Sequence, residues 1–395
     1  MKKITVLLSL ILIVTCAVCF VACGTLPITS DSATQGTKQA EQSIDEGKEY
    51  ASISDAAQDV LSAGNFEGAE VPAYADDDFL VGYFGYVKFG MYPQTVATKD
   101  ALKQMSQTTD STGYYVSAFD GEHYARISTA MTYGEDYTFI DEKDITSREM
   151  YYFKVEPIKW RIFGKVDLAS GMKTLYLLSD YILDSSSFMS ANKFSEDPGE
   201  GVFYIKNGTD NPSNWLVSDL RTFLNDDFSV KAFTEEELAK IVPQKTVVTK
   251  SVFDETTGAD KEVEEEYYDT AFALSYEKAS SIEAGYRVAQ LSDYARCRNT
   301  FMTIHQNWYG NGRWWTSTVS ASDNVREKSY RVSYISDYIA KGDEDLVKEA
   351  EDVMKKGESV AATYMGVRPA IVLTVDDAIQ IVTKEEEAEE QEGKK

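Results

Sequence analysis

The sequence is poor in cysteine, histidine and positive charge for a chain of 395 residues. It contains four cysteines and two histidines, and its 39 Lys and Arg residues are outnumbered by 65 Asp and Glu residues, so the formal net charge is −26. This charge argues against a nucleic-acid partner, because such binding depends on Lys and Arg releasing counterions from phosphates. The phosphate-binding G-x-x-x-x-G-K-S/T loop and the G-x-S-x-G nucleophile elbow are also absent from the sequence.

Cysteine usage excludes a disulfide-stabilised domain. Three of the four cysteines, Cys16, Cys19 and Cys23, lie near the N-terminus, and Cys297 is the only one in the rest of the chain. A secreted domain without disulfides must be stabilised by burial, which a chain of this length with 43% hydrophobic residues allows. Cys297 could be a nucleophile or a buried apolar residue. We favour the buried state, because neither histidine forms a recognisable catalytic arrangement with it.

The N-terminus is typical of a bacterial lipoprotein. Lys2 and Lys3 are followed by an apolar run over Ile4–Ala22 and then by Cys23, which is the order of an n-region, an h-region and a cleavage site. The residues at this point resemble a lipobox, which predicts a signal peptide over residues 1–22 and a lipid anchor on Cys23. An uncleaved anchor helix is the alternative, since the run is long enough to cross about 30 Å of hydrocarbon. Both place the rest of the chain at the extracellular face of the cytoplasmic membrane.

Composition divides the rest of the chain into three parts. Residues 23–78 are rich in small, polar and acidic residues, which predicts a flexible linker with a short helix over Ser52–Ala63. Residues 79–376 contain no repeat of fixed period and no break in composition, so we expect a single globular domain. Residues 377–395 are predicted to form a charged, solvated tail.

Short segments rich in Val, Ile, Tyr, Phe and Trp predict an antiparallel β-rich fold with few helices. Strands are expected at Tyr83–Phe89, Ile158–Val166, Thr174–Ser179, Thr246–Phe253, Glu262–Tyr268, Lys328–Ile335 and Ala370–Val375. A polar turn between Thr246–Phe253 and Glu262–Tyr268 predicts a β-hairpin. Helical spacing of apolar residues predicts helices over Ser213–Leu224 and Asp343–Lys356, and Thr234 opens another helix with a capping-box pattern.

Seven short motifs follow one another along the chain. They are Phe89–Thr95 (FGMYPQT), Pro157–Phe163 (PIKWRIF), Leu175–Ser179 (LYLLS), Trp215–Asn225 (WLVSDLRTFLN), Phe272–Glu277 (FALSYE), Arg313–Ser317 (RWWTS) and Gly366–Ala370 (GVRPA). In this order they resemble a family of uncharacterised extracellular domains from Gram-positive bacteria, often found in surface and lipid-anchored proteins. The closing motifs are also similar to those of the formylglycine-generating enzyme and C-type-lectin-like superfamily.

The resemblance implies an α+β, C-type-lectin-like fold, in which a twisted antiparallel sheet is surrounded by short helices and extensive loops. The catalytic chemistry of the superfamily does not transfer, because the sulfatase-modifying enzymes need cysteines for copper-dependent oxidation and Cys297 stands alone. The Glu-Pro-Asn, Gln-Pro-Asp and Trp-Asn-Asp segments of calcium-dependent lectins are also missing from the sequence. No cofactor is therefore expected.

Several motif residues are predicted to be structural. Four tryptophans are expected in the core, since each can bury a large apolar surface: Trp160, Trp215, Trp314 and Trp315. Arg221 and Arg368 are expected to support the scaffold by pairing with buried carboxylates or carbonyls, such as those of Asp219 or Asp184.

The loop over His305–Arg313 is the strongest candidate for a binding site. Its glycines and asparagines force a loop, while its aromatic rings supply flat faces and its amides supply donors and acceptors. This combination suits a sugar or peptide, so Trp308, Tyr309, Asn311 and Arg313 are the predicted ligand-binding residues. The alternative is a loop whose aromatic side chains fold back under neighbouring strands.

Metal binding is not expected. The acidic residues of the predicted hairpin lack the spacing of an EF-hand loop and are predicted to form a solvated face, with a calcium site as the open alternative. His123 and His305 have no histidine or cysteine partner at a zinc-binding spacing.

These observations favour a non-catalytic binding or interaction module at the cell surface, for a glycan, a cell-wall component or a protein. The first alternative is an extracellular carbohydrate-active or other wall-modifying enzyme, which paired carboxylates about 5 to 9.5 Å apart in an open cleft would indicate. The second is a structural accessory lipoprotein, which an exposed contiguous apolar patch would indicate.

Overall fold

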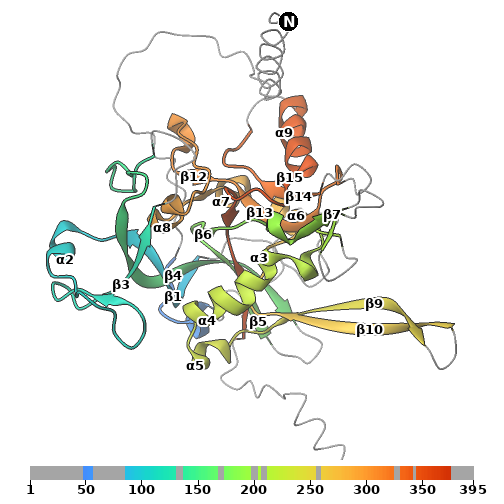
Figure 1. The fold of residues 1–395 in the computed structure, drawn as a ribbon, viewed down its shortest axis with the longest axis horizontal. Helices are drawn as coiled ribbons and strands as arrows, with labels where there is room; N and C mark the ends of the chain where they lie inside the picture. The colour runs from blue at the N-terminus through green and yellow to red at the C-terminus, as the bar shows by residue number, and fades with distance from the viewer. Residues whose placement is uncertain are drawn as a thin grey trace, which may run out of the picture. The chain divides into compact units, whose positions relative to one another are not determined.

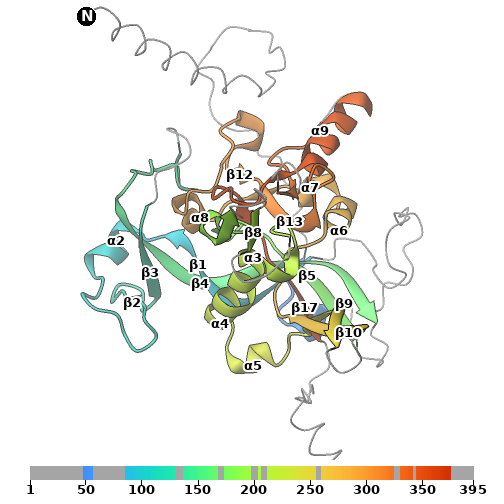
Figure 2. The same cartoon turned by 45° about the vertical axis from the view of Figure 1, so that its right-hand side comes forward.

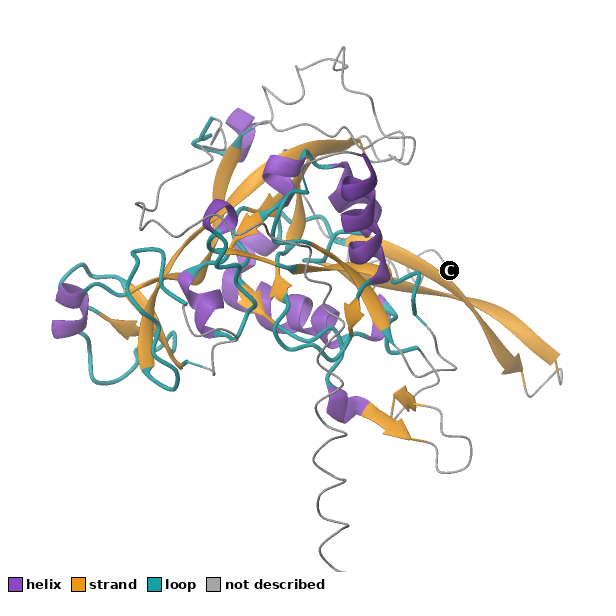
Figure 3. Cartoon of the chain, turned by 90° about the horizontal axis from the view of Figure 1, so that it is seen from above, coloured by secondary structure: helices purple, strands orange, loops and turns teal. Residues whose placement is uncertain are grey.

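Strands dominate the fold and most helices are short, as Figure 3 shows. The computed structural model describes residues 48–56, 85–129, 137–167, 173–196, 203–205, 211–254, 259–323, 330–340 and 344–374. All of them belong to one compact unit, residues 41–395. The predicted signal peptide, the anchor at Cys23 and the charged tail lie outside the described residues. The expected α+β class, with antiparallel sheets, is confirmed.

The larger sheet is built on β4, an 18-residue strand that pairs with three neighbours. Its strand order is β17 (Ala370–Thr374), β5 (Lys173–Ser179), β4 (Met150–Asp167), β3 (His123–Ser128) and β2 (Tyr115–Val116), with β1 (Tyr86–Val96) also paired to β4. All of these pairs are antiparallel. Every residue of β17 is buried, which explains why this strand is a continuous apolar run instead of alternating.

A second sheet carries the paired tryptophans. Its strand order is β15 (Glu358–Ser359), β14 (Arg331–Ile335), β13 (Trp314–Val319), β16 (Gly366–Val367) and β6 (Asp184–Ser185). Trp314 and Trp315 on β13 and Trp160 on β4 are buried, so their predicted core positions are confirmed. Trp215 is only partly buried, and its indole Nε1 donates to Asp269 at 2.8 Å.

Short two-stranded sheets complete the strand structure. The predicted hairpin is formed by β9 (Gln244–Asp254) and β10 (Ala259–Asp269), which pair along their whole length from Gln244↔Asp269 to Asp254↔Ala259. Figure 1 shows this hairpin projecting away from the other labelled elements. Two small pairs are β7 (Phe194–Glu196) with β8 (Phe203–Ile205) and β11 (Ala289–Gln290) with β12 (Asn311–Gly312). Each strand predicted from the sequence overlaps an observed strand.

The helix predicted over Ser213–Leu224 differs in its bounds. The chain makes a 3₁₀ turn, η2 (Trp215–Val217), and a continuous helix starts after Ser218, whose hydroxyl accepts from the backbone N–H of Arg221. This helix comprises α3 (Asp219–Thr222), a π-helical segment η3 (Phe223–Phe228) and α4 (Ser229–Ala232).

Other helices agree more closely with the sequence prediction. The capping box of α5 (Glu235–Leu238) is formed by Thr234 and Glu237 as predicted. α9 (Glu344–Lys356) occupies the predicted helix except for Asp343, which lies outside the described residues. α9 and α6 (Tyr276–Ser281) pack against β14 on the second sheet. Figure 2 shows both helices on the side of the fold where β13 of that sheet lies. The remaining short helices are α2 (Lys99–Lys103), α7 (Ala284–Arg287) and α8 (Asp293–Cys297).

Part of the predicted linker belongs to the folded unit. Residues 48–56 lie against β1, where the backbone N–H of Tyr50 donates to the carbonyl of Tyr86 at 2.9 Å. Tyr50 and Ala56 are buried in the main core. Residues 53–56 are helical, and the rest of the helix predicted to end at Ala63 lies outside the described residues. Backbone hydrogen bonds to β1 and a few buried apolar side chains therefore dock this polar segment onto the larger sheet.

Candidate functional site

The predicted binding loop is largely integrated into the fold. Asn311 lies on β12 and is buried, and its amide Nδ2 donates to the backbone carbonyl of Asp337 at 3.2 Å. Arg313 Nε donates to Asp337 Oδ1 at 3.0 Å, and the guanidinium lies 4.4 Å from the centroid of the Phe301 ring. Both polar side chains therefore fasten the loop to the segment that follows β14.

The two aromatic residues of this loop differ in their surroundings. The Tyr309 hydroxyl lies 2.7 Å from Thr138 Oγ1, and the ring packs against the main core. Trp308 ends a short 3₁₀ turn, η4 (Gln306–Trp308), and is partly exposed. The structure thus brings Asn311 and Arg313 together at Asp337. The ligand-binding role of Trp308, Tyr309, Asn311 and Arg313 stays a prediction.

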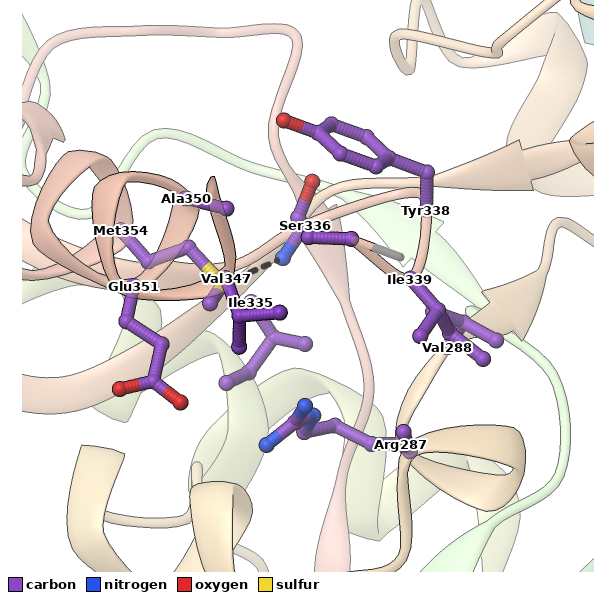
Figure 4. Close-up of a pocket in the computed structure, with 12 residues that line it drawn as sticks. Arg287, Val288, Ile335, Ser336, Tyr338, Ile339, Val347, Ala350, Glu351 and Met354 are labelled. Atoms are coloured by element: carbon purple, nitrogen blue, oxygen red, sulfur yellow. Dashed lines mark hydrogen bonds between the residues drawn. The ribbon is translucent and has the colours of Figure 1, made fainter. Parts of the chain in front are cut away.

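A cavity of about 140 Å³ lies between α7, α9 and the segment that follows β14. Figure 4 shows the residues that line it, with α9 on one side and Arg287 and Val288 on the other. The lining is mostly apolar and consists of Ala284, Arg287, Val288, Ile335, Ser336, Tyr338, Ile339, Ala340, Val347, Ala350, Glu351 and Met354. Small-molecule sites have this character, with apolar walls and few polar groups that orient the ligand.

The amphipathic sequence of α9 forms one wall of the cavity. Val347, Ala350, Glu351 and Met354 are spaced as i, i+3, i+4 and i+7 and therefore share one helix face. Met354 is buried, and its sulfur accepts from the backbone N–H of Ser336 at 3.3 Å, the bond drawn in Figure 4. Gly357 ends the helix with φ +71°, a conformation that disfavours a side chain. The wall is thus fixed at its C-terminal end.

Two charged side chains of opposite sign face this apolar space. Arg287 comes from α7, and its Nη1 donates to the carbonyl of Ser280 at 2.9 Å, its only side-chain hydrogen bond to the described residues. Glu351 comes from α9, and its carboxylate has no hydrogen bond or ion pair with the part of the chain that the structure describes. No ion pair within 4.0 Å joins the two groups. In Figure 4 they come from opposite walls of the cavity and both lie in the lower half of the view.

The charges of Arg287 and Glu351 both influence the pKa of the buried phenol of Tyr276. Burial raises the pKa of Tyr276, the negative charge of Glu351 raises it further, and the positive charge of Arg287 lowers it. Tyr276 is 5% exposed, so its hydroxyl remains protonated at neutral pH. The two charges are therefore close enough to act on one buried group without neutralising each other by contact.

The remaining chemically reactive groups have other roles. Burial raises the pKa of the Cys297 thiol to about 12, which leaves it unreactive at neutral pH and agrees with the predicted buried state. His123 Nε2 lies 2.9 Å from Asp110 Oδ2 on the surface. Among the described residues, no group of three or more His, Cys, Asp or Glu side chains is arranged to hold a metal. No described helix combines the length and apolar character needed to cross a bilayer.

Sequence reasoning missed Arg287 and Glu351. Arg287 and Glu351 lie 64 positions apart, on the four-residue helix α7 and on the amphipathic helix α9. One signal was present: Glu351 interrupts the apolar face of α9, where a charge disfavours burial unless it has a partner. The position of Arg287 opposite that face depends on the tertiary fold.

A family model described as "Domain of unknown function (DUF6273)" matches residues 173–375, just over half of the chain. The chain belongs to this family. The DUF6273 region begins with β5 and includes both walls of the cavity as well as the loop over His305–Arg313. Strands β1 to β4 precede it and complete the larger sheet through the pairing of β4 with β5. Neither a curated protein nor a solved structure matches the chain.

Proposed function

We propose that this chain is a cell-surface lipoprotein, anchored through Cys23, whose DUF6273 domain is a non-catalytic binding module. The ligand is a glycan, a cell-wall component or a protein, and the domain has a C-type-lectin-like fold related to that of surface proteins of Gram-positive bacteria. The observation that carries the proposal is the cavity between α7 and α9, where an apolar wall is combined with two opposite charges that are not paired with each other.

The chemistry of this cavity suits holding a ligand. A partly buried guanidinium and a partly buried carboxylate form charge-assisted hydrogen bonds with a ligand, which are stronger than those between neutral groups. The apolar wall adds about 25 cal/mol for each Å² of ligand surface removed from water. Arg287 and Glu351 can thus orient a bound molecule, while the residues of α9 supply contact area.

The anchor is tested by metabolic labelling with a fatty acid that carries a chemical tag. We expect the label on the parent protein and on a Cys19→Ser variant, because Cys23 follows the predicted cleavage site directly. A Cys23→Ser variant should carry no label and should leave the membrane fraction. Label that persists on Cys23→Ser would contradict the proposed anchor.

The binding function is tested with the purified lipoprotein in detergent on arrays of glycans and peptidoglycan fragments. We expect binding to at least one class, with a loss in Trp308→Ala if the predicted loop takes part. Equal binding by Trp308→Ala and parent removes that loop from the site and leaves the cavity as its location. An absence of binding to every glycan, wall fragment and surface protein tested contradicts the binding module.

The β9–β10 hairpin favours a second candidate, a structural accessory lipoprotein. Val247 and Tyr268 lie on one face of this projecting hairpin and are 48% and 47% exposed, and Val263 on its other face is 41% exposed, so both faces offer apolar side chains to another protein. A variant that joins Thr246 to Tyr267 by an Asn-Gly turn keeps their pairing and removes the projecting part. A smaller detergent-extracted complex on native gels supports this role, and an unchanged size contradicts it.

A further inference from the structure

We infer that the cavity between α7 and α9 binds the zwitterionic end of an α-amino acid that has an apolar body. The carboxylate pairs with Arg287, the ammonium pairs with Glu351, and the body contacts Val347, Ile335 and Met354. The inference deepens the proposed binding function and rests on it. Two sources share this chemistry: a free amino acid, and the side-chain end of a diamino dicarboxylic acid in a cell-wall peptide.

The charges select for a ligand that carries both signs. An anion alone would pair with Arg287 and leave Glu351 unpaired in an apolar wall, and a cation alone would leave Arg287 unpaired. Both side chains are partly exposed, but each loses hydration when a ligand covers the cavity, and a charge that is then left without a partner disfavours binding. A zwitterion satisfies both groups at once. Arg287 has donors to spare for it, because only Nη1 is engaged, with the carbonyl of Ser280.

The size and lining of the cavity set the body of the ligand. An apolar protein cavity of about 150 Å³ takes up a benzene-sized molecule, and this cavity measures about 140 Å³. Leucine, methionine and phenylalanine carry apolar groups of that order. Met354 is a suitable wall for them, because its flexible and polarisable side chain adapts to the shape of an apolar partner.

The placement of the two charges makes this recognition specific to the fold. Arg287 is the last residue of α7, and its backbone N–H donates to the carbonyl of Glu283 at 3.0 Å. The backbone carbonyl of Arg287 accepts from Arg368 Nη1 at 2.9 Å and from Trp314 Nε1 at 3.2 Å. The guanidinium is therefore carried by backbone that the buried core fixes, which lowers the entropy lost when a ligand binds.

The test is isothermal titration of the full-length lipoprotein in detergent with leucine, N-acetyl-leucine and leucinamide. Leucine should bind, and each derivative, which lacks one of the two charges, should bind about 10- to 100-fold more weakly. Alanine should also bind more weakly, because it leaves the apolar wall in contact with water. Equal binding of leucine and both derivatives would overturn the inference.

Variants locate the site. Arg287→Gln and Glu351→Gln should each weaken leucine binding about 10- to 100-fold. Lys348→Gln and Glu349→Gln make the same changes of charge on exposed positions of α9 and should bind like the parent. Binding of leucine should also shift the methyl NMR signal of Met354. Unchanged binding in Arg287→Gln and Glu351→Gln contradicts the assignment to this cavity.

Two further arms separate the sources and separate this inference from the proposed function. A wall peptide that contains diaminopimelate should compete with leucine if wall peptides are the source, and leucine alone should titrate the cavity if free amino acids are. Binding of a glycan or wall fragment, with no binding of leucine or of the wall peptide, would refute the inference and leave the binding module standing. If no ligand of any class binds, both fail.

Discussion

Removing the guanidinium of Arg221 should destabilise the folded unit by about 3 kcal/mol. Asp269 lies at the base of the β9–β10 hairpin with 4% of its side chain exposed, and Arg221 Nε donates to its Oδ1 at 2.5 Å. Loss of one partner of a buried ion pair costs roughly 3 to 5 kcal/mol, since the other charge stays buried. We expect the lower end of that range for Arg221→Met, because Trp215 and Asn225 continue to donate to Asp269.

A double-mutant cycle gives the sharper test. Asp269→Asn should cost about 2 kcal/mol, while the double variant should cost about 3 to 4 kcal/mol instead of the additive 5, because the unpaired charge is gone. Urea unfolding monitored by tryptophan fluorescence measures each value. Lys231→Met is the matched control on the same helix, since its ion pair with Asp227 is solvent-exposed and should contribute less than about 0.5 kcal/mol. Strict additivity, or an Arg221→Met variant as stable as the control, would refute the reasoning.

Three other substitutions or conditions test the scaffold. Cys297 should react with a thiol reagent only after unfolding. Its pKa is raised from 9.0 to about 12 in the folded protein. The contribution of Cys297 to the free energy of unfolding, measured by urea titration, should therefore be complete below pH 9 and lost as pH rises toward 12. Gly90→Ala should prevent folding, as judged by circular dichroism, since Gly90 has φ +67° and a Cβ there would lie 2.6 Å from the Phe233 ring. Thr234→Ala should cost about 1 kcal/mol in the same urea assay by opening its capping box with Glu237, and an unchanged midpoint would contradict that role.

Local patterns in the sequence were sufficient for the hairpin, for the capping box of α5 and for strands β1, β4, β5, β14 and β17, whereas β3 and β13 were not predicted. The hairpin was predictable because its polar turn and two strands rich in β-branched and aromatic residues lie within one short segment, and its register then follows from the turn. Thr234 and Glu237 are three positions apart, so their capping box is visible in the sequence. The fold class follows from the same local evidence, since short β-rich segments separated by turns are typical of antiparallel sheets.

Interactions between distant segments could not be predicted in this way. Arg221 was expected to pair with a buried carboxylate or carbonyl, such as that of Asp219 or Asp184. It does contact a buried carboxylate, but that of Asp269, 48 positions away, which the sequence did not indicate. Asp219 instead accepts from the backbone N–H of Ser190 at 2.7 Å. The start of the helix was misplaced for a related reason. Trp215 fits a helical apolar pattern, but its indole reaches Asp269 from a separate 3₁₀ turn.

The candidate site shows the same limit. The predicted loop was chosen for residue types that bind sugars, yet Asn311 and Arg313 use their donors on Asp337. The cavity depends on Arg287 and Glu351, which only the packing of α9 beside α7 brings to one space. A charge on the apolar face of an amphipathic helix is a useful signal in such cases, because it marks a place where the helix faces a polar or hydrated space instead of the apolar core.

Arg368, which lies between β16 and β17, has a consequence for how the protein is made. Its guanidinium Nε donates to the carbonyl of Ser179 at 2.8 Å, across 189 positions of sequence, just where β17 joins the edge of β5. A nascent polypeptide cannot close this seam until its late residues have been synthesised, and contacts of such long range slow the final collapse. The larger sheet is therefore completed only after residues 370–374 have been synthesised, although β4 and β5 can pair earlier.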